Sequence, residues 1–323
     1  MNTSVWYDCF LKALYEKYPK KVQLTEALME LLSIEREAVY RRLRKNVAFS
    51  AHDMAKISNA WDISIDNALN VVSEDRDFFY LDILSDSNPK GKNQQQIKNY
   101  LHVLETITAS PASEYMEISN TLPSSLLQNY PLLLKLHIYI WWYYYGNNGN
   151  TCPFSQFELP EKILQLETQY YDKIKNISHV NYMWDNQIIQ HLIDYILYLE
   201  SIYALSKEEI QLFKQEISRF LDEMEILSMQ GKFAGDNENK QVDMYISNIN
   251  IDSNYYYFHS PRVNIFGIKV FFEYIVASTN KSICENFKKW MLAQKKISIP
   301  ISQVNEKQRI EFFKQQREIL EKM

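Results

Sequence analysis

The sequence predicts a mainly α-helical protein: an N-terminal five-helix domain followed by a larger helical domain with a small β-containing part at its C-terminal end. Only 6 Gly and 9 Pro occur in 323 residues, which favours long helices over a loop-rich or all-β fold. Apolar residues recur at helical spacing along most of the chain. Alternation typical of strands begins only after residue 240.

Composition places the chain among ordinary globular proteins, with 46% hydrophobic and 23% charged residues. The three cysteines, Cys9, Cys152 and Cys284, are odd in number and far apart, which favours a reducing compartment over a disulfide framework. No signal peptide is recognised at the start. The most apolar run, residues 130–146, is shorter than the roughly 20 residues of a membrane span. We therefore expect a cytoplasmic protein without membrane association.

A polar stretch, SDSNPKGKNQQQ, indicates a break in the chain before residue 93, and DFFYLDIL before it is either a strand or a docking segment. The predicted organisation has four parts: a helix-turn-helix domain over 1–75, a linker over 76–92, a helical domain over 93–232, and an α+β segment over 233–323 packed on the helical domain.

The N-terminal helices follow from apolar spacing and from end signals. Pro19 ends the first helix, Ser33 and Ile34 form a tight turn, and Ser50 with Asp53 forms a capping box. The five predicted helices cover 4–18, 24–32, 35–45, a segment starting at Ser50, and 64–72.

The larger domain is justified in the same way. Ser206 and Glu209 form a capping box at the start of a long helix, and Gly231 ends it. Pro160 is predicted at the first position of another helix, and Ser302 as the cap of the last one. Strands are expected within 242–276, and a helix over 280–295.

One basic cluster stands out in a chain of net charge −5. Five Lys and Arg residues lie within 36–45, and on a helix Val39 and Leu43 would face inward. Arg36, Tyr40 and Arg44 would then share the opposite face. Arginine presents a planar fork of donors that suits guanine edges and phosphates. The alternative, a solvated basic face on a structural helix, is the common explanation of a charge run. The preceding amphipathic helix, the short turn and the capped helix afterwards favour DNA binding.

Residues 22–72, with LLSIEREAVYRRLR followed by FSAHDMAKISNAWDISID, resemble the lambda repressor/Cro-like (XRE-type) helix-turn-helix domain. The resemblance implies that 35–45 is a recognition helix in the major groove of double-stranded DNA, and that the protein is a homodimer. The chain departs from the pattern at Met29, at Ser33 in place of the turn glycine, and at Glu35 in place of serine. The whole layout, including KKISIPISQVNEKQRIEFFKQQ, is similar to a group of bacterial transcriptional regulators.

The predicted DNA-binding residues all come from this helix and its end. Arg36, Tyr40 and Arg41 are expected in base or groove contacts, Arg44 and Lys45 at phosphates, and Glu37 beside them.

Other chemistry finds little support in the sequence. The six histidines show no metal-ligand spacing with one another or with cysteine, and no glycine-rich phosphate loop occurs. We therefore expect no metal, no cofactor and no enzyme activity. The aromatic clusters at 141–146 and 254–259 are interpreted as core, with a ligand pocket between the helical region and the C-terminal strands as the alternative. The C-terminal region is expected to sense a small-molecule or protein effector or to mediate assembly. The competing function is a helical protein-interaction scaffold without specific DNA binding.

Overall fold

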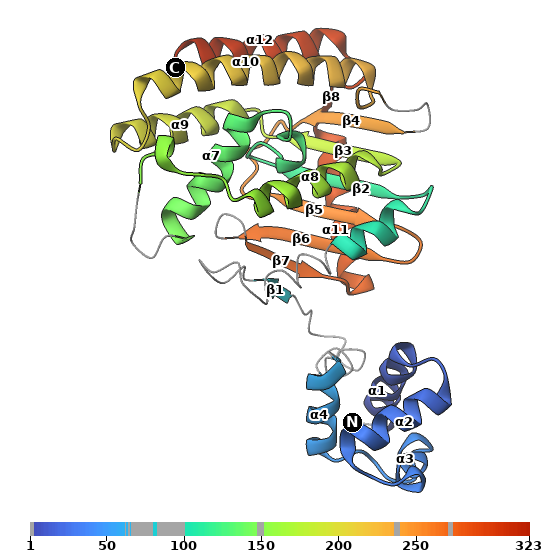
Figure 1. The fold of residues 1–323 in the computed structure, drawn as a ribbon. Coiled ribbons are helices and arrows are strands. Elements are labelled where there is room, and N and C mark those ends of the chain that lie inside the picture. Colours follow the sequence, from blue (N-terminus) through green and yellow to red (C-terminus); the bar gives the residue numbers. More distant parts are fainter. Residues whose placement is uncertain are drawn as a thin grey trace. The chain divides into compact units, whose positions relative to one another are not determined.

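A computed structural model of the protein describes residues 3–61, 63, 65, 80–82, 101–146, 152–235, 240–270 and 274–323. The chain divides into two compact units, Met1–Phe78 and Phe79–Met323, which we call the N-terminal unit and the C-terminal unit. Each unit is described by itself. The described residues are mostly helical, with one mixed β-sheet (Figure 1).

The described part of the N-terminal unit contains four helices around a small core. Aromatic and aliphatic side chains of α1 and α2 meet Val39 of α3 and Ile57 of α4, and both of these are fully buried. The predicted Ser50–Asp53 capping box is confirmed, since each backbone N–H donates to the other residue's side-chain oxygen at 3.1 Å. The fifth predicted helix, 64–72, falls almost wholly outside the described residues. The bounds are α1 Thr3–Lys17, α2 Lys21–Leu32, α3 Arg36–Leu43 and α4 Ala51–Trp61.

The C-terminal unit is built on an eight-stranded sheet of order β1-β7-β6-β5-β2-β3-β4-β8. Strands β2, β3 and β4 run parallel to one another, and the remaining pairs are antiparallel. The strand bounds are β1 Tyr80–Asp82, β2 Glu114–Ser119, β3 His179–Trp184, β4 Gln241–Ile246, β5 Tyr255–His259, β6 Asn264–Val270, β7 Tyr274–Ser278 and β8 Ile299–Pro300.

Two strands lie where the sequence predicted only helices. β2 and β3 interrupt the expected helical domain of 93–232 and form the centre of the sheet, so its β part is neither small nor confined to the C-terminal end. All residues of both strands after the first are buried, which removes the in–out alternation that identifies a half-exposed strand. Within the predicted linker 76–92, Tyr80–Asp82 pairs with β7 as an edge strand, which confirms the strand alternative given for DFFYLDIL.

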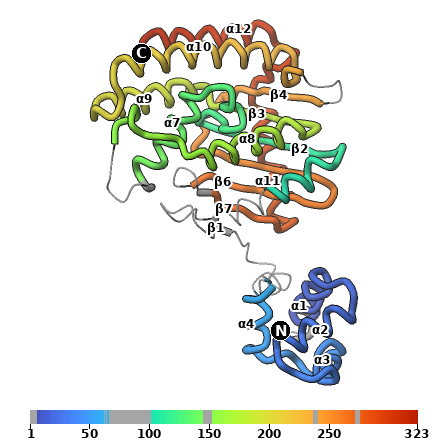
Figure 2. Tube along the Cα trace, in the orientation of Figure 1, coloured from blue at the N-terminus to red at the C-terminus, as the bar shows by residue number. Residues whose placement is uncertain are grey.

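Helices cover both faces of the sheet. Helices α7, α8 and α9 lie on one face and α11 on the other (Figure 1), with α10 and α12 completing the first layer. α10 and α12 run antiparallel, and the C-terminal end of the chain reaches the start of α10, where Lys214 Nζ donates to the Glu321 carbonyl at 3.1 Å (Figure 2). The bounds are α7 Pro131–Trp141, α8 Glu161–Lys175, α9 Ile188–Ser201, α10 Lys207–Gln230, α11 Lys281–Ile297 and α12 Glu306–Glu321; residues 101–108 are also helical.

The end signals of these helices were predicted with mixed success. The Ser206–Glu209 capping box is present, and Gly231 ends α10 with a φ of 65°. Pro160 precedes α8 as its N-cap instead of its first residue. Ser302 does not cap α12, because its hydroxyl accepts the Met244 N–H at 2.6 Å and so belongs to the edge of the sheet.

One carboxylate lies within the larger core. Glu117 of β2 is 2% exposed and accepts a 2.6 Å hydrogen bond from the Tyr115 hydroxyl. Burial raises the pKa of Glu117 to about 7, against the opposing effects of that hydrogen bond and of the nearby Lys269 and His137. Folding therefore favours the protonated carboxyl group.

We predict that Glu117→Gln removes a pH dependence of stability. The contribution of Glu117 is complete below its unfolded-state pKa of 4.5 and is lost as the pH rises through about 7. Relative to Glu117→Gln, the wild-type free energy of unfolding should fall by about 3 kcal/mol from about pH 4 to about pH 8. Urea titrations of both proteins at several pH values measure this difference, and a difference that stays constant would contradict it.

Candidate nucleic-acid interface

The α2–turn–α3 segment packs as a helix-turn-helix through its buried leucines and valine. Leu28 and Leu32 of α2 meet Val39 and Leu43 of α3, and none of the four is more than 7% exposed. Ser33 closes α2 in the left-handed region, with φ of 52°, and its N–H donates to the Met29 carbonyl. Serine thus takes the conformation for which glycine is preferred in this turn, at a cost of roughly 1 kcal/mol.

The rotation of α3 about its axis decides which side chains reach solvent. Val39 is fully buried and Leu43 is 6% exposed, so the opposite side of the helix faces outward. Among the predicted DNA-binding residues, Tyr40 is half-buried and the other five are exposed: Arg36, Glu37, Arg41, Arg44 and Lys45.

Tyr40 lies between basic groups from two helices. Lys21 Nζ, in the first turn of α2, is 5.8 Å from the ring centroid, and Arg44 Cζ is 5.6 Å from it. Lys20, the N-cap of α2, makes no capping hydrogen bond with its side chain. Exposed Lys20 and Lys21 therefore extend the basic surface beyond α3. Neither lysine is among the predicted DNA-binding residues, although two lysines at the start of the first helix of such a motif are a usable signal.

Arg42 is the half-buried basic residue of the cluster, and its side chain contacts the fold. Its Nη1 donates to the Ala38 carbonyl at 3.2 Å, and its Nη2 lies 3.6 Å from Asp53 Oδ2 on α4. The Tyr7 hydroxyl strengthens the same junction, because it donates to the Arg42 carbonyl and accepts the Phe49 N–H at 3.1 Å. Arg42 thus fastens the end of α3 to α1 and α4.

Lys45 follows α3 in a left-handed conformation and forms an ion pair with Asp8 of α1. The Lys45 and Asp8 side chains are 54% and 42% exposed. An exposed pair of this kind contributes about 1 kcal/mol or less, so a phosphate can compete for the ammonium group.

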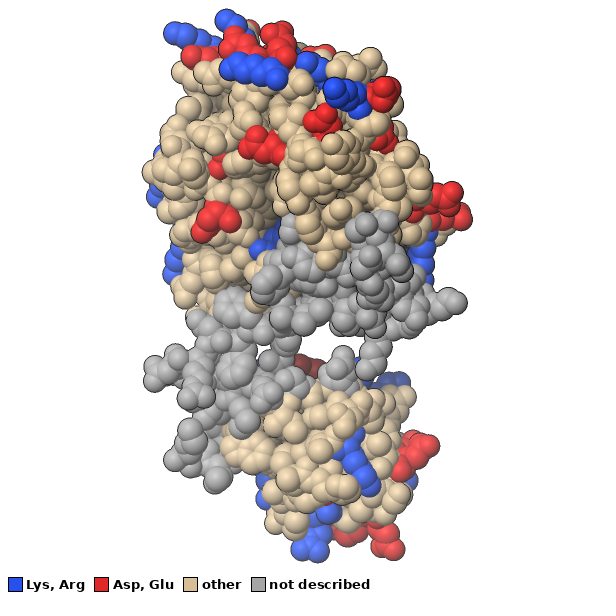
Figure 3. Space-filling model, turned by 90° about the vertical axis from the view of Figure 1, so that its left-hand side faces the viewer, with Lys and Arg blue, Asp and Glu red and all other residues tan. Residues whose placement is uncertain are grey.

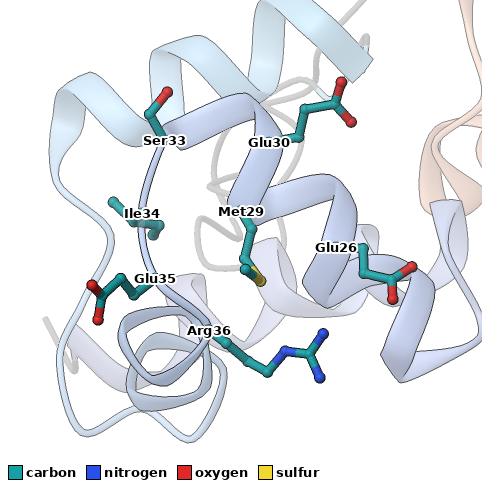
Figure 4. Close-up of a pocket in the computed structure, with 7 residues that line it drawn as sticks. All are labelled: Glu26, Met29, Glu30, Ser33, Ile34, Glu35 and Arg36. Atoms are coloured by element: carbon teal, nitrogen blue, oxygen red, sulfur yellow. The ribbon is translucent and has the colours of Figure 1, made fainter.

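Acidic side chains adjoin the basic surface. A shallow hollow of about 520 Å³ beside the turn is lined by Met29, Arg36 and three glutamates, Glu26, Glu30 and Glu35, with the turn residues completing it. Figure 4 shows Arg36 extending below Met29 toward the side of Glu26, whereas Glu35 points the other way. Glu35 is the N-cap of α3 but makes no capping hydrogen bond with its side chain. These carboxylates weaken the attraction of the surface for phosphates.

Both units carry basic and acidic side chains on the face shown in Figure 3. Basic and acidic side chains occur together on the N-terminal unit and over α10 and α12 (Figure 3). Over α10 and α12 they pair, as where Arg317 bridges Asp222 and Glu225. The arrangement of donors on α3, more than net charge, therefore distinguishes the candidate interface.

The part of the chain that the structure describes has neither a metal-binding group nor a membrane-spanning helix. It contains no group of three or more His, Cys, Asp or Glu side chains placed to hold a metal ion. None of its helices combines the length and apolarity that a transmembrane segment requires.

Comparison with known proteins adds no relative. No protein-family model matches the chain, and neither a curated protein nor a solved structure does so.

We predict that substitution of two neighbouring arginines lowers stability to different extents. Arg42→Ala should lower the free energy of unfolding by about 1–2 kcal/mol, because it removes the contacts to Ala38 and Asp53. Arg41→Ala, on the exposed side, should change it by less than about 0.5 kcal/mol. Denaturant titration of the two variants measures both values, and equal losses would show that the assignment of inner and outer arginines is wrong.

Proposed function

We propose that the protein is a sequence-specific, double-stranded-DNA-binding transcriptional regulator of the lambda repressor-like (XRE) type. The observation that carries the proposal is the outward row of Arg36, Tyr40 and Arg44 on α3, one helical turn apart, on a helix whose other side is buried. In this interpretation α3 enters the major groove, as the recognition helix of such motifs does.

The proposed roles follow from chemistry and place. Arg36 and Arg41 carry planar donor groups at the exposed surface and are suited to base edges. Arg44 and Lys45, at the end of α3, and Lys21, at the start of α2, would contact phosphates and so set the position of the helix on the duplex. Glu37 would disfavour phosphates close to the start of α3.

A single helix-turn-helix covers one half-site, so we propose a homodimer on a palindromic operator. The C-terminal unit would then supply the assembly surface or sense an effector. Separate roles for DNA binding and for assembly or sensing are supported by the two hydrophobic cores, one in each unit.

The alternative is a protein-interaction scaffold that uses the same surface. It is favoured by the hollow with Glu26, Glu30 and Glu35, which suits a basic protein segment better than a nucleic acid. Binding to duplex DNA at several salt concentrations separates the two functions. A regulator binds the duplex at low salt and loses affinity steeply as counterions are released, whereas a scaffold does not bind the duplex.

We predict that Arg36→Ala with Arg41→Ala weakens binding to a selected duplex by at least about tenfold, since each lost contact to a base or phosphate costs about 1 kcal/mol or more. The matched control is Lys12→Ala with Lys17→Ala, which removes the same charge from exposed positions of α1. Gel shifts and circular dichroism of both variants measure affinity and folding. Equal affinity of the two double variants would refute the assigned role of α3.

We also predict that Glu35→Gln with Glu37→Gln tightens binding to random-sequence duplex DNA several-fold, because two negative charges next to the phosphates are removed. The control is Glu16→Gln, which neutralises an exposed carboxylate on α1. Fluorescence anisotropy at low salt measures the change. Unaltered affinity of the double variant would place the start of α3 away from the DNA.

A further inference from the structure

The C-terminal unit contains a cavity that none of the preceding roles uses. It holds about 660 Å³ and is half open to solvent. Volumes of this size are typical of sites for small organic ligands. Its position is the carboxyl end of the parallel strands, because segments that follow β2, β3 and β4 all contribute to its lining. In sheets of this kind, ligands bind at that edge.

Two helices form the apolar walls of the cavity. Residues at positions i, i+3, i+4 and i+7 of each helix line it, so that one side of α7 faces one side of α9 across the space. Each set contains three bulky apolar or aromatic side chains and one histidine. The sets are Leu133, Leu136, His137 and Ile140 on α7, and Ile188, His191, Leu192 and Tyr195 on α9.

Hydrogen bonds hold the strand-end segments in place. The Asn120 N–H donates to Asn254 Oδ1 at 3.1 Å, and Asn254 Nδ2 donates to Thr121 Oγ1 at 2.7 Å. His191 Nδ1 donates to the Asn120 carbonyl at 3.1 Å, which ties α9 to the end of β2. Asn254 is only 3% exposed. The cavity is thus formed by a fixed framework.

The ionisable side chains of the cavity differ in exposure. Lys269 of β6 and His137 of α7 are half-buried, whereas Asp194 and Asp252 are exposed. Each aspartate accepts a hydrogen bond inside the protein, from Gln190 Nε2 at 2.7 Å and from the Tyr255 hydroxyl at 2.5 Å respectively, and Lys269 and His137 also act on the carboxyl group of Glu117. The less solvated charge, which acts more strongly on a bound ligand, is therefore the ammonium group of Lys269.

We propose that this cavity binds a small organic carboxylate with an apolar body. The carboxylate would pair with Lys269, assisted by His137, and the apolar body would lie between the walls formed by α7 and α9. Binding concerns the C-terminal unit alone; only the use of the ligand as an effector of DNA binding rests on the proposed function.

Isothermal titration of the full-length protein with octanoate, octanol and octylammonium tests the head group while keeping the apolar body constant. We expect octanoate to bind at one site per chain, at least about tenfold more tightly than the other two compounds. Octylammonium binding as tightly as octanoate, or no octanoate binding at all, would overturn the proposal.

Variants locate the site. Lys269→Met should weaken octanoate binding by about tenfold, whereas Lys207→Met, at an exposed position of α10, should leave it unchanged. If Lys269→Met does not fold, Leu192→Trp provides the test. Leu192 is half-exposed in the cavity wall, so the larger indole side chain should occupy the cavity and abolish octanoate binding. Wild-type affinity in the folded variant would refute the site.

Gel shifts with and without octanoate separate this proposal from the proposed function. Octanoate binding with unchanged DNA affinity would leave the ligand site standing and remove its role as an effector site. If the protein binds octanoate but no DNA, the proposed regulator function is refuted and the proposed carboxylate site is not.

Discussion

The burial of Val39 and Leu43 is the constraint on which the account of α3 depends. These two side chains lie one turn apart and are fixed against α1, α2 and α4, so the helix cannot rotate without exposing them. Losing that burial would cost several kcal/mol in a domain with a small core. With the rotation fixed, every other side chain of α3 has a determined direction. Arg42 turns to Asp53 and the core, and the remaining arginines reach solvent.

The two units differ in where their charged groups lie. The N-terminal unit presents several exposed cations on and next to α3 and has few buried polar groups, which suits a charged partner. The C-terminal unit holds Glu117 in the centre of its sheet, within a large core, and the half-buried Lys269 at the cavity. Such groups are costly to bury and are common at ligand sites. A charged surface on one unit and a partly open cavity on the other are compatible with the proposed ligand-responsive regulator.

Sequence reasoning succeeded where signals are local. The Ser50–Asp53 and Ser206–Glu209 capping boxes fix helix starts through contacts three residues apart, and both are present in the structure. It failed where pairing is distant. β2 pairs with β3 across about sixty residues of chain, and both strands are buried on two faces, so neither shows the alternation that strands usually do. Ser302 resembled a helix cap, but its partner is Met244, on a strand far away in the sequence.

The candidate interface shows the same division. Helical spacing alone predicts which side of α3 is apolar, and hence that Arg36 and Arg44 lie opposite Val39. Spacing could not show that Arg42 is held by Asp53, that Lys45 pairs with Asp8, or that Lys21 approaches Tyr40, because each contact joins separate helices. The cavity lies between the helical region and the C-terminal strands, where a ligand pocket was predicted as an alternative. That α7 and α9 form its walls could not be predicted, since they meet only after β2 and β3 pair.

Selection of bound sequences from a random pool of duplex DNA tests the central claim most directly. With the full-length protein, the account predicts enrichment of a palindromic sequence whose half-sites are one helical turn apart, or a multiple of it. Recovery of sequences no different from the starting pool, from a protein shown to be folded, would contradict the claim that α3 reads DNA.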